Sequence, residues 1–197
     1  MKVKRHYYIL TFFILIVFSI IILRYSNQEN SSEFKLNTAI DKYNLVTHTG
    51  KKFNNEYISN IPSLFFFGFL NCPDVCPNTL IKISEIITDM ENIDDNVRFY
   101  FITVDPERDT VENMKDYLSN FNDNIIGVTG APDSIDNFLK YMYVYSKKVF
   151  LNDSEYTFDH SSQVFLYRRN GSFFGTFSLT ESNKIIYDKI YKIINGA

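Results

Sequence analysis

Apolar and polar residues along the chain form segments that predict strands and helices in alternation. Residues 63–70 are apolar on both faces, which predicts a central strand covered by helices on each side. Three shorter apolar segments predict further strands, at residues 45–47, 98–104 and 125–129. Apolar residues at helical spacing up to Met90 predict a helix with Pro77 in its first turn, and two further helices are predicted over residues 110–121 and 132–145.

The C-terminal part of the chain predicts a hairpin followed by a helix. Strands at residues 164–167 and 173–177 flank Asn170-Gly171, a pair typical of a primed two-residue turn. An amphipathic helix is expected over residues 180–195, ended by Gly196.

The order of these elements predicts the fold class. Strands and helices alternate before the late hairpin, and Asp109 with Glu112 resembles a capping box that opens one of the helices. This order is typical of an α/β domain with a mixed sheet flanked by helices, here over residues 36–197.

The N-terminus has a different pattern. Residues 7–23 carry no charged side chain, and basic residues in 1–6 precede them, which predicts a transmembrane anchor with residues 1–6 in the cytoplasm. Residues 24–35 are expected to form a linker. A cleavable signal peptide is the alternative, although no small-residue cleavage site follows. The expected location is the bacterial inner membrane with the domain in the periplasm; the alternative is the mitochondrial inner membrane, facing the intermembrane space.

Composition excludes some classes of function. Hydrophobic residues make up 45% of the chain and charged residues 22%, the balance of a folded protein. The formal net charge is −3, and no long basic block follows the first few residues, so nucleic-acid binding has no support.

The chain has two cysteines, Cys72 and Cys76, where the central strand is expected to end and a helix to begin. Backbone amides and the helix dipole at such a junction favour the thiolate, which is the form that binds metals and attacks disulfides. A disulfide enclosing so few residues stabilises a fold little, so the pair indicates metal or redox chemistry, with a structural or incidental pair as the alternative.

A third candidate ligand is His160, which lies beside Asp159 far along the chain. Asp159 is a candidate acceptor that orients the His160 ring, or else it caps a turn. Two thiolates and one imidazole suit copper, provided that the fold brings them together. The other histidines, His6 and His48, are expected to have no role in the site.

Three segments of the chain resemble the signature segments of the Sco/SenC family: residues 67–77 with both cysteines, residues 101–110, and residues 159–161 with His160. Members of that family are membrane-anchored copper chaperones for cytochrome c oxidase assembly. The resemblance implies a thioredoxin-like fold with Cu(I) or Cu(II) held by Cys72, Cys76 and His160. It also implies delivery of copper to the dinuclear copper site of oxidase subunit II, or reduction of the cysteines of that site.

Two further residues lie in the second of these segments. Asp105 is expected to be a turn residue before Pro106, with a role as an oxygen ligand or in tuning the copper environment as the alternative. Arg108 is expected to be solvated, with pairing to a nearby carboxylate as the alternative.

Three functions remain open from the sequence. The first is a metallochaperone, which is not an enzyme. The second is a thiol–disulfide oxidoreductase that reduces target cysteines through Cys72 and Cys76. The third, a peroxidase or redox sensor, needs one cysteine of low pKa and has no other support. A histidine such as His160 has no obvious use in a pure oxidoreductase, which favours the metallochaperone.

Overall fold

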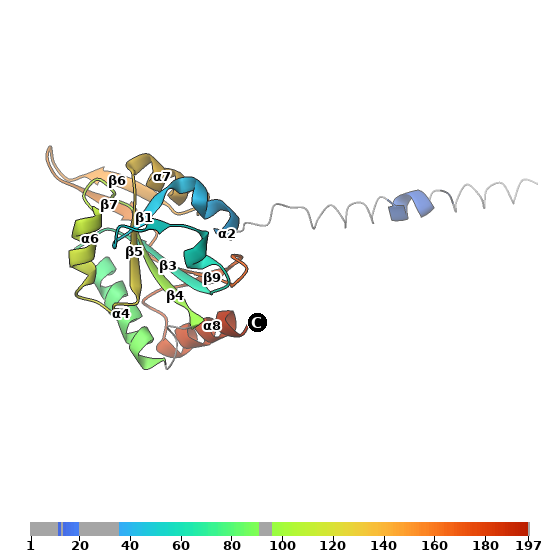
Figure 1. The fold of residues 1–197 in the computed structure, drawn as a ribbon. Coiled ribbons are helices and arrows are strands. Elements are labelled where there is room, and N and C mark those ends of the chain that lie inside the picture. Colours follow the sequence, from blue (N-terminus) through green and yellow to red (C-terminus); the bar gives the residue numbers. More distant parts are fainter. Residues whose placement is uncertain (1–11, 13, 20–35, 91–95, 197) are drawn as a thin grey trace, which may run out of the picture. The chain divides into compact units, whose positions relative to one another are not determined.

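The computed structural model describes residues 12, 14–19, 36–90 and 96–196 (Figure 1). The chain divides into two units, Met1–Phe34 and Lys35–Ala197. In the first unit residues 12 and 14–19 are helical and exposed. No helix in the described part of the chain is long and apolar enough to cross a membrane. The expected cytoplasmic segment 1–6, the linker 24–35 and most of the expected anchor 7–23 lie outside the described residues.

The second unit is built on a seven-stranded mixed sheet with the order β2-β1-β5-β4-β3-β8-β9. Its strands are β1 (Leu45–Thr47), β2 (Lys52–Phe53), β3 (Ser63–Gly68), β4 (Arg98–Thr103), β5 (Ile125–Thr129), β8 (Val164–Tyr167) and β9 (Phe173–Phe177). The central strands β3, β4 and β5 are parallel, while β8 runs antiparallel to β3. The predicted mixed sheet is confirmed.

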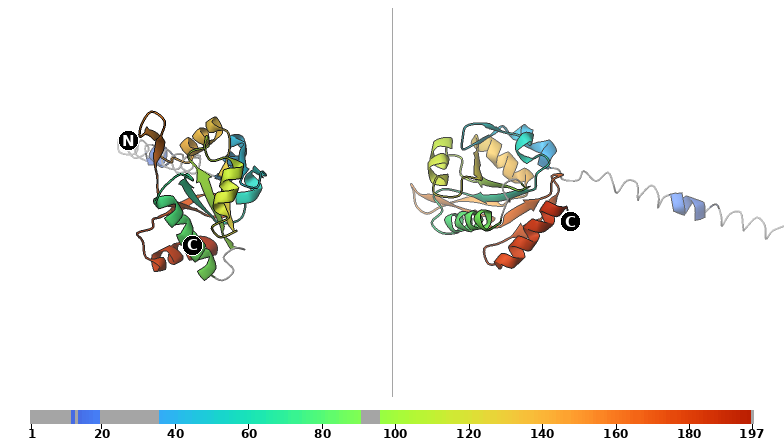
Figure 2. Two further views of the ribbon diagram at one scale, coloured as in Figure 1. Left: turned by 90° about the vertical axis from the view of Figure 1, so that its left-hand side faces the viewer. Right: turned by 60° about the horizontal axis from the view of Figure 1, so that its bottom comes forward.

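Helices cover both faces of this sheet, as Figure 2 shows. They are α2 (Leu36–Ala39), the 3₁₀ turn η1 (Ile40–Tyr43), α3 (Asn55–Ile58), α4 (Val75–Asp89), α6 (Val111–Leu118), α7 (Pro132–Tyr141) and α8 (Asn183–Asn195). In the right-hand view α4 and α8 lie on one side of the sheet, and α2 and α7 lie on the other. Helix cover on both faces explains why all six residues of β3 are buried.

The two central helices begin close to their predicted positions. Helix α4 starts at Val75, so its first turn contains Pro77, as predicted, and also Cys76. Helix α6 has Thr110 as its N-cap, whose side chain accepts a hydrogen bond from the Asn113 amide. The capping-box prediction at Asp109 was therefore wrong, because Asp109 is buried in contacts with the rest of the domain.

The β8–β9 hairpin is confirmed, but its turn is not the primed turn that was predicted. Only Gly171 has a positive φ, of 79°, and its amide donates to the Arg168 carbonyl at 2.8 Å. The Arg168 amide in turn donates to the Ser172 carbonyl at 2.9 Å. This is a three-residue loop with a glycine bulge, which matches strand twist with a single left-handed residue.

The sequence did not predict a second, two-stranded sheet formed by β6 (Ser146–Phe150) and β7 (Tyr156–His160). Its residues are mostly exposed or half-buried, so no apolar alternation marks the strands. In the antiparallel register Ser146 pairs with His160 and Phe150 with Tyr156. This β6–β7 ribbon therefore ends at a candidate ligand.

Candidate metal centre

The fold brings Cys76 and His160 into contact although they lie 84 positions apart in the chain. Cys76 is fully buried at the start of α4, and its Sγ lies 3.8 Å from Nε2 of His160 at the end of β7. The Cys72 Sγ accepts a hydrogen bond from the Cys76 amide at 3.5 Å. The Cys76 sulfur and the His160 imidazole therefore lie side by side, and the Cys72 sulfur lies next to the Cys76 backbone.

The three side chains are not yet arranged as a closed metal site. Among the residues that the structure describes, no group of three His, Cys, Asp or Glu side chains is close enough together to hold a metal ion. Both cysteines are free thiols, and Cys72 is the more exposed of the two. Closing the site on a metal therefore requires a small movement, and the half-buried Cys72 is the side chain with room to make it.

Burial controls the protonation of Cys76. Desolvation raises the pKa of the Cys76 thiol, and hydrogen bonding with the Cys72 side chain raises it further, whereas a hydrogen bond from the Phe69 backbone opposes this shift. Burial of Cys76 therefore acts against the thiolate that the helix start was expected to favour. A buried neutral thiol is a poor peroxide nucleophile, but a soft metal ion displaces its proton on binding.

Gly68 makes space for the Cys76 sulfur. A Cβ built on Gly68 would lie 2.7 Å from Cys76 Sγ and 2.9 Å from a carbon of the Phe101 ring. The last residue of β3 is therefore a glycine for steric reasons, and the thiol lies directly against the backbone of the sheet.

The ring of His160 has a defined orientation. Its Nδ1 lies 2.9 Å from the Ser161 carbonyl, which can only accept, so Nδ1 carries the proton and Nε2 presents a lone pair towards Cys76. Burial lowers the pKa of His160, which keeps the ring neutral and able to bind a metal. The hypothesis that Asp159 accepts from this ring was wrong, because the Ser161 carbonyl occupies that place.

Aromatic rings hold the imidazole from the side. The Phe69 ring lies edge-on to His160 with centroids 5.7 Å apart, and Phe158 lies 5.8 Å from Phe69. The open side of the site is a cavity of about 390 Å³, lined by residues from the start of α4 and from β7: Phe69, Cys72, Pro73, Asp74, Val75, Thr157, Phe158, Asp159, His160 and Ser162. This cavity gives access to the Cys72 sulfur and the His160 imidazole.

Asp105 and Arg108 pair with each other near the site. The Asp105 side chain is fully buried, forms an ion pair with Arg108, and accepts a hydrogen bond from the Tyr156 hydroxyl at 3.2 Å. These contacts occupy the carboxylate, so they do not support Asp105 as an oxygen ligand. The expectation of a solvated Arg108 was wrong, since its guanidinium binds the carboxylate and the ribbon.

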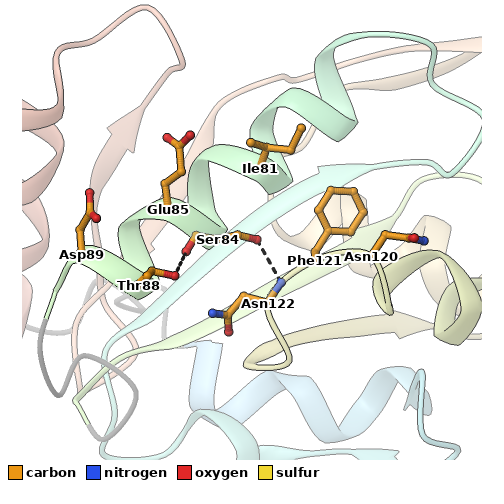
Figure 3. Close-up of a pocket in the computed structure, with 8 residues that line it drawn as sticks. All are labelled: Ile81, Ser84, Glu85, Thr88, Asp89, Asn120, Phe121 and Asn122. Atoms are coloured by element: carbon orange, nitrogen blue, oxygen red, sulfur yellow. Dashed lines mark hydrogen bonds between the residues drawn. The ribbon is translucent and has the colours of Figure 1, made fainter.

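A second cavity lies on the same side of the sheet, against α4, and is shown in Figure 3. It is bounded by α4 and by residues 120–122, where the Asn122 amide donates to Ser84 Oγ at 3.1 Å. Its lining contains neither sulfur nor imidazole: Ile81, Ser84, Glu85, Thr88, Asp89, Asn120, Phe121 and Asn122. This second cavity therefore offers no sulfur or imidazole to a copper ion.

Asp109 is a buried acid close to the site. The sequence did not reveal its role. Its carboxylate accepts from the Leu70 amide at 3.2 Å and from the Thr103 hydroxyl at 2.6 Å, and so ties the end of β3 to the end of β4. Desolvation raises the pKa of Asp109 to about 6, although both hydrogen bonds oppose that change. The only sequence signal was an acid just after an apolar strand, which is also the signal of a helix cap.

The raised pKa of Asp109 predicts how the free energy of unfolding changes with pH. Between the unfolded value of 3.8 and about 6, the folded chain binds more protons at Asp109 than the unfolded chain does, so stability falls as pH rises through this window. The loss amounts to about 3 kcal/mol by pH 7. Asp109→Asn removes this dependence, so urea unfolding at pH 4 and pH 7 should show the variant gaining about 2 kcal/mol relative to wild type between the two, since part of the loss has already occurred at pH 4. An equal difference between variant and wild type at both pH values would contradict the prediction.

The geometry defines a class of protein: a thioredoxin-like α/β domain that presents two thiols and an imidazole at the end of its central strand. A sequence profile of the SCO1/SenC family matches residues 32–195. The chain therefore belongs to the SCO1/SenC family.

Individual relatives agree with this assignment. The chain is 35% identical to the SCO2-like protein of Rickettsia conorii, covering 72% of this chain and 70% of that one. It is 37% identical to the mitochondrial SCO1 homolog 1 of Arabidopsis thaliana, covering 63% of this chain but 37% of the relative. The structure of copper-bound ScoI from Bradyrhizobium japonicum superposes with a TM-score of 0.71 at 38% identity, covering 76% of this chain and 95% of that one.

Proposed function

We propose that this protein is a copper metallochaperone that binds copper through Cys72, Cys76 and His160. The observation that carries the proposal is the 3.8 Å contact between Cys76 Sγ and His160 Nε2, made between distant segments of the chain. Thiolate ligands favour Cu(I), and an imidazole also suits Cu(II), so the donor set accepts both oxidation states. The copper-bound ScoI structure supports the choice of metal.

Transfer of copper to another protein follows from the number of donors. Two sulfurs and one nitrogen leave a coordination position open, and the cavity of about 390 Å³ beside His160 leads to it. A cysteine of the acceptor is able to enter that position before the donor ligands leave, so that copper is not released into solution. We infer that the acceptor is the dinuclear copper site of cytochrome c oxidase subunit II, a target implied by family membership.

We further propose that residues 7–23 anchor the protein in a membrane. The uncharged segment preceded by basic residues supports a bacterial inner membrane with the domain in the periplasm. The match to a mitochondrial relative keeps the mitochondrial inner membrane, facing the intermembrane space, as the alternative.

Replacing His160 tests the ligand set. His160→Ala in the full chain should lose Cu(II) binding far more than Cu(I) binding, because the two thiolates still satisfy Cu(I). The measurements are the copper-to-protein ratio and the Cu(II) electron paramagnetic resonance spectrum, in which nitrogen coupling should disappear. The matched control is His48→Asn, since Nδ1 of His48 accepts from the Gly127 amide at 2.9 Å and an asparagine oxygen preserves that acceptor. Full Cu(II) binding with unchanged nitrogen coupling in His160→Ala would remove this residue from the site.

The second candidate function is reduction of disulfides in the target. The unequal exposure of the cysteines favours it, because the more exposed Cys72 suits attack and the buried Cys76 suits resolution of the mixed disulfide. Offering the reduced, metal-free chain an oxidised subunit II peptide, and the copper-loaded chain a reduced peptide, separates the two activities. Reduction of the peptide disulfide without copper transfer would establish a reductase instead of a chaperone.

A further inference from the structure

His160 lies on the β6–β7 ribbon, which is a separate two-stranded sheet and not part of the main sheet. A two-stranded ribbon has marginal stability of its own. At its far end Phe150 and Leu151 are 72% and 65% exposed, so little apolar packing holds that end. The position of the His160 imidazole therefore depends on whatever contacts fasten the ribbon to the domain.

One such contact is made by Arg108, which follows β4. Its Nη1 donates to the Tyr156 carbonyl at 3.1 Å, and its Cζ lies 3.9 Å from the centre of the Tyr156 ring. The same guanidinium forms an ion pair with the buried Asp105 carboxylate. Arg108 is thus bound to Asp105 in the main domain, and it contacts both the backbone and the ring of Tyr156, the first residue of β7.

Contacts around Tyr156 complete the attachment. The Tyr156 hydroxyl donates to Asp105 Oδ1 at 3.2 Å. From β6, Lys148 Nζ lies 4.1 Å from the centre of the same ring and 2.5 Å from Oε2 of Glu107. The tyrosine ring therefore contacts two cations, and both strands of the ribbon are joined to residues 105–108.

The alternation of a strand connects this attachment to His160. Tyr156, Phe158 and His160 lie on one face of β7, since successive side chains of a strand point to opposite faces. Their rings form a continuous path: Tyr156 to Phe158 at 5.9 Å, Phe158 to Phe69 at 5.8 Å, and Phe69 to His160 at 5.7 Å. Displacement of Tyr156 therefore shifts the packing against which the imidazole rests.

We propose that Asp105, Arg108 and Tyr156 form a latch that positions His160 against Cys76. These are positioning residues, because they act through the ribbon and do not bind the metal. The proposal deepens the proposed function, since a positioned imidazole matters most if His160 is a copper ligand. It assigns a role to the acidic and basic residues of the segment 105–108, which the metal site itself leaves unused.

The first test needs no copper. The chain has three histidines, so a full-length chain labelled with ¹³C at histidine Cε1 gives three ring signals, with His48 as an internal reference. In Arg108→Gln the His160 signal should move towards that of a solvated imidazole and broaden, while His48 stays in place. The matched control is Arg168→Gln: Arg168 also lies over a ring, Phe174, at 4.7 Å, but on the β8–β9 hairpin.

The second test uses copper. Arg108→Gln should weaken Cu(II) binding by about 10- to 100-fold, the usual cost of losing a partner that orients a metal ligand, and should affect Cu(I) much less. Arg168→Gln should match wild type for both ions. General destabilisation would instead weaken Cu(I) and Cu(II) binding alike. If Arg108→Gln does not fold, Tyr156→Phe keeps the ring and removes only the contacts of the hydroxyl with Asp105 and Glu107, and it should give a smaller shift in the same direction.

The outcomes separate this proposal from the proposed function. A His160 signal that stays in place in Arg108→Gln and in Tyr156→Phe would overturn the latch, whatever copper does. A His160 signal that moves supports the latch. If it moves while Cu(II) binding of the wild type proves independent of His160, the latch stands and the ligand assignment fails.

Discussion

Cys76→Ser should abolish stoichiometric copper binding. A serine hydroxyl is neither soft nor ionised at neutral pH, so the buried end of the site loses its metal donor. The affinity for Cu(I) should fall by more than the roughly 100-fold that loss of a mere orienting partner costs. Serine is close in size to cysteine, and Cys76 is fully buried, so the fold itself should change little. Dialysis followed by measurement of the copper-to-protein ratio provides the test.

The control for this substitution is the neighbouring residue in the same helical turn. Val75 is 38% exposed and has no donor atom in its side chain, so Val75→Ala changes the helix start without touching the ligands. It should bind copper as wild type does. Retention of one equivalent of Cu(I) by Cys76→Ser would show that the metal lies elsewhere, and would remove the chemical basis of the proposed function.

Gly68→Ala should impair both stability and metal binding. The new Cβ would lie 2.7 Å from Cys76 Sγ and 2.9 Å from the Phe101 ring, closer than real contacts allow. Cysteine has too short a side chain to move aside without movement of its helix, so α4 must shift away from the sheet. We expect a loss of about 1–3 kcal/mol in the free energy of unfolding, typical of overpacking, together with a weaker site because the sulfur is displaced from His160.

Gly127→Ala is the matched control, because it overpacks the same face of the sheet at a place remote from the cysteines. Its Cβ would collide with Met114 and Leu118, two long side chains on α6. It should also lose stability, though less than Gly68→Ala because these long side chains can move aside, and yet keep the copper affinity and the thiolate-to-copper absorption of wild type. Loss of copper by both variants alike would mean that binding follows overall stability and not the place of the Cys76 sulfur.

Local pattern was enough to predict the central part of the fold. The run at 63–70 has no polar face, and it forms the fully buried strand β3. The segment at 125–129 forms β5, and Gly196 ends α8 in a left-handed conformation, as such glycines commonly do. These features depend on neighbours in the chain, so they are visible in a single sequence.

The errors arose where distant residues intervene. Asp109 has the spacing of a helix cap, yet contacts with the ends of β3 and β4 draw it into the interior and leave capping to Thr110. The β6–β7 ribbon escaped prediction because it is fastened by Arg108 and the Phe69 ring, which lie in other segments of the chain, and not by a buried apolar face.

Some features of the candidate site likewise follow from the sequence, and others depend on the tertiary structure. Spacing and chemical softness singled out Cys72, Cys76 and His160, because donor identity belongs to each residue type. The protonation of these residues and the distances between them do not follow from residue type. Burial favours the neutral thiol of Cys76, and the Ser161 carbonyl binds Nδ1 of His160, so that Nε2 faces Cys76. Desolvation and long-range contacts exist only once the chain has folded, so the candidate donor atoms could be named from the sequence, while their protonation and their approach to one another are set by packing.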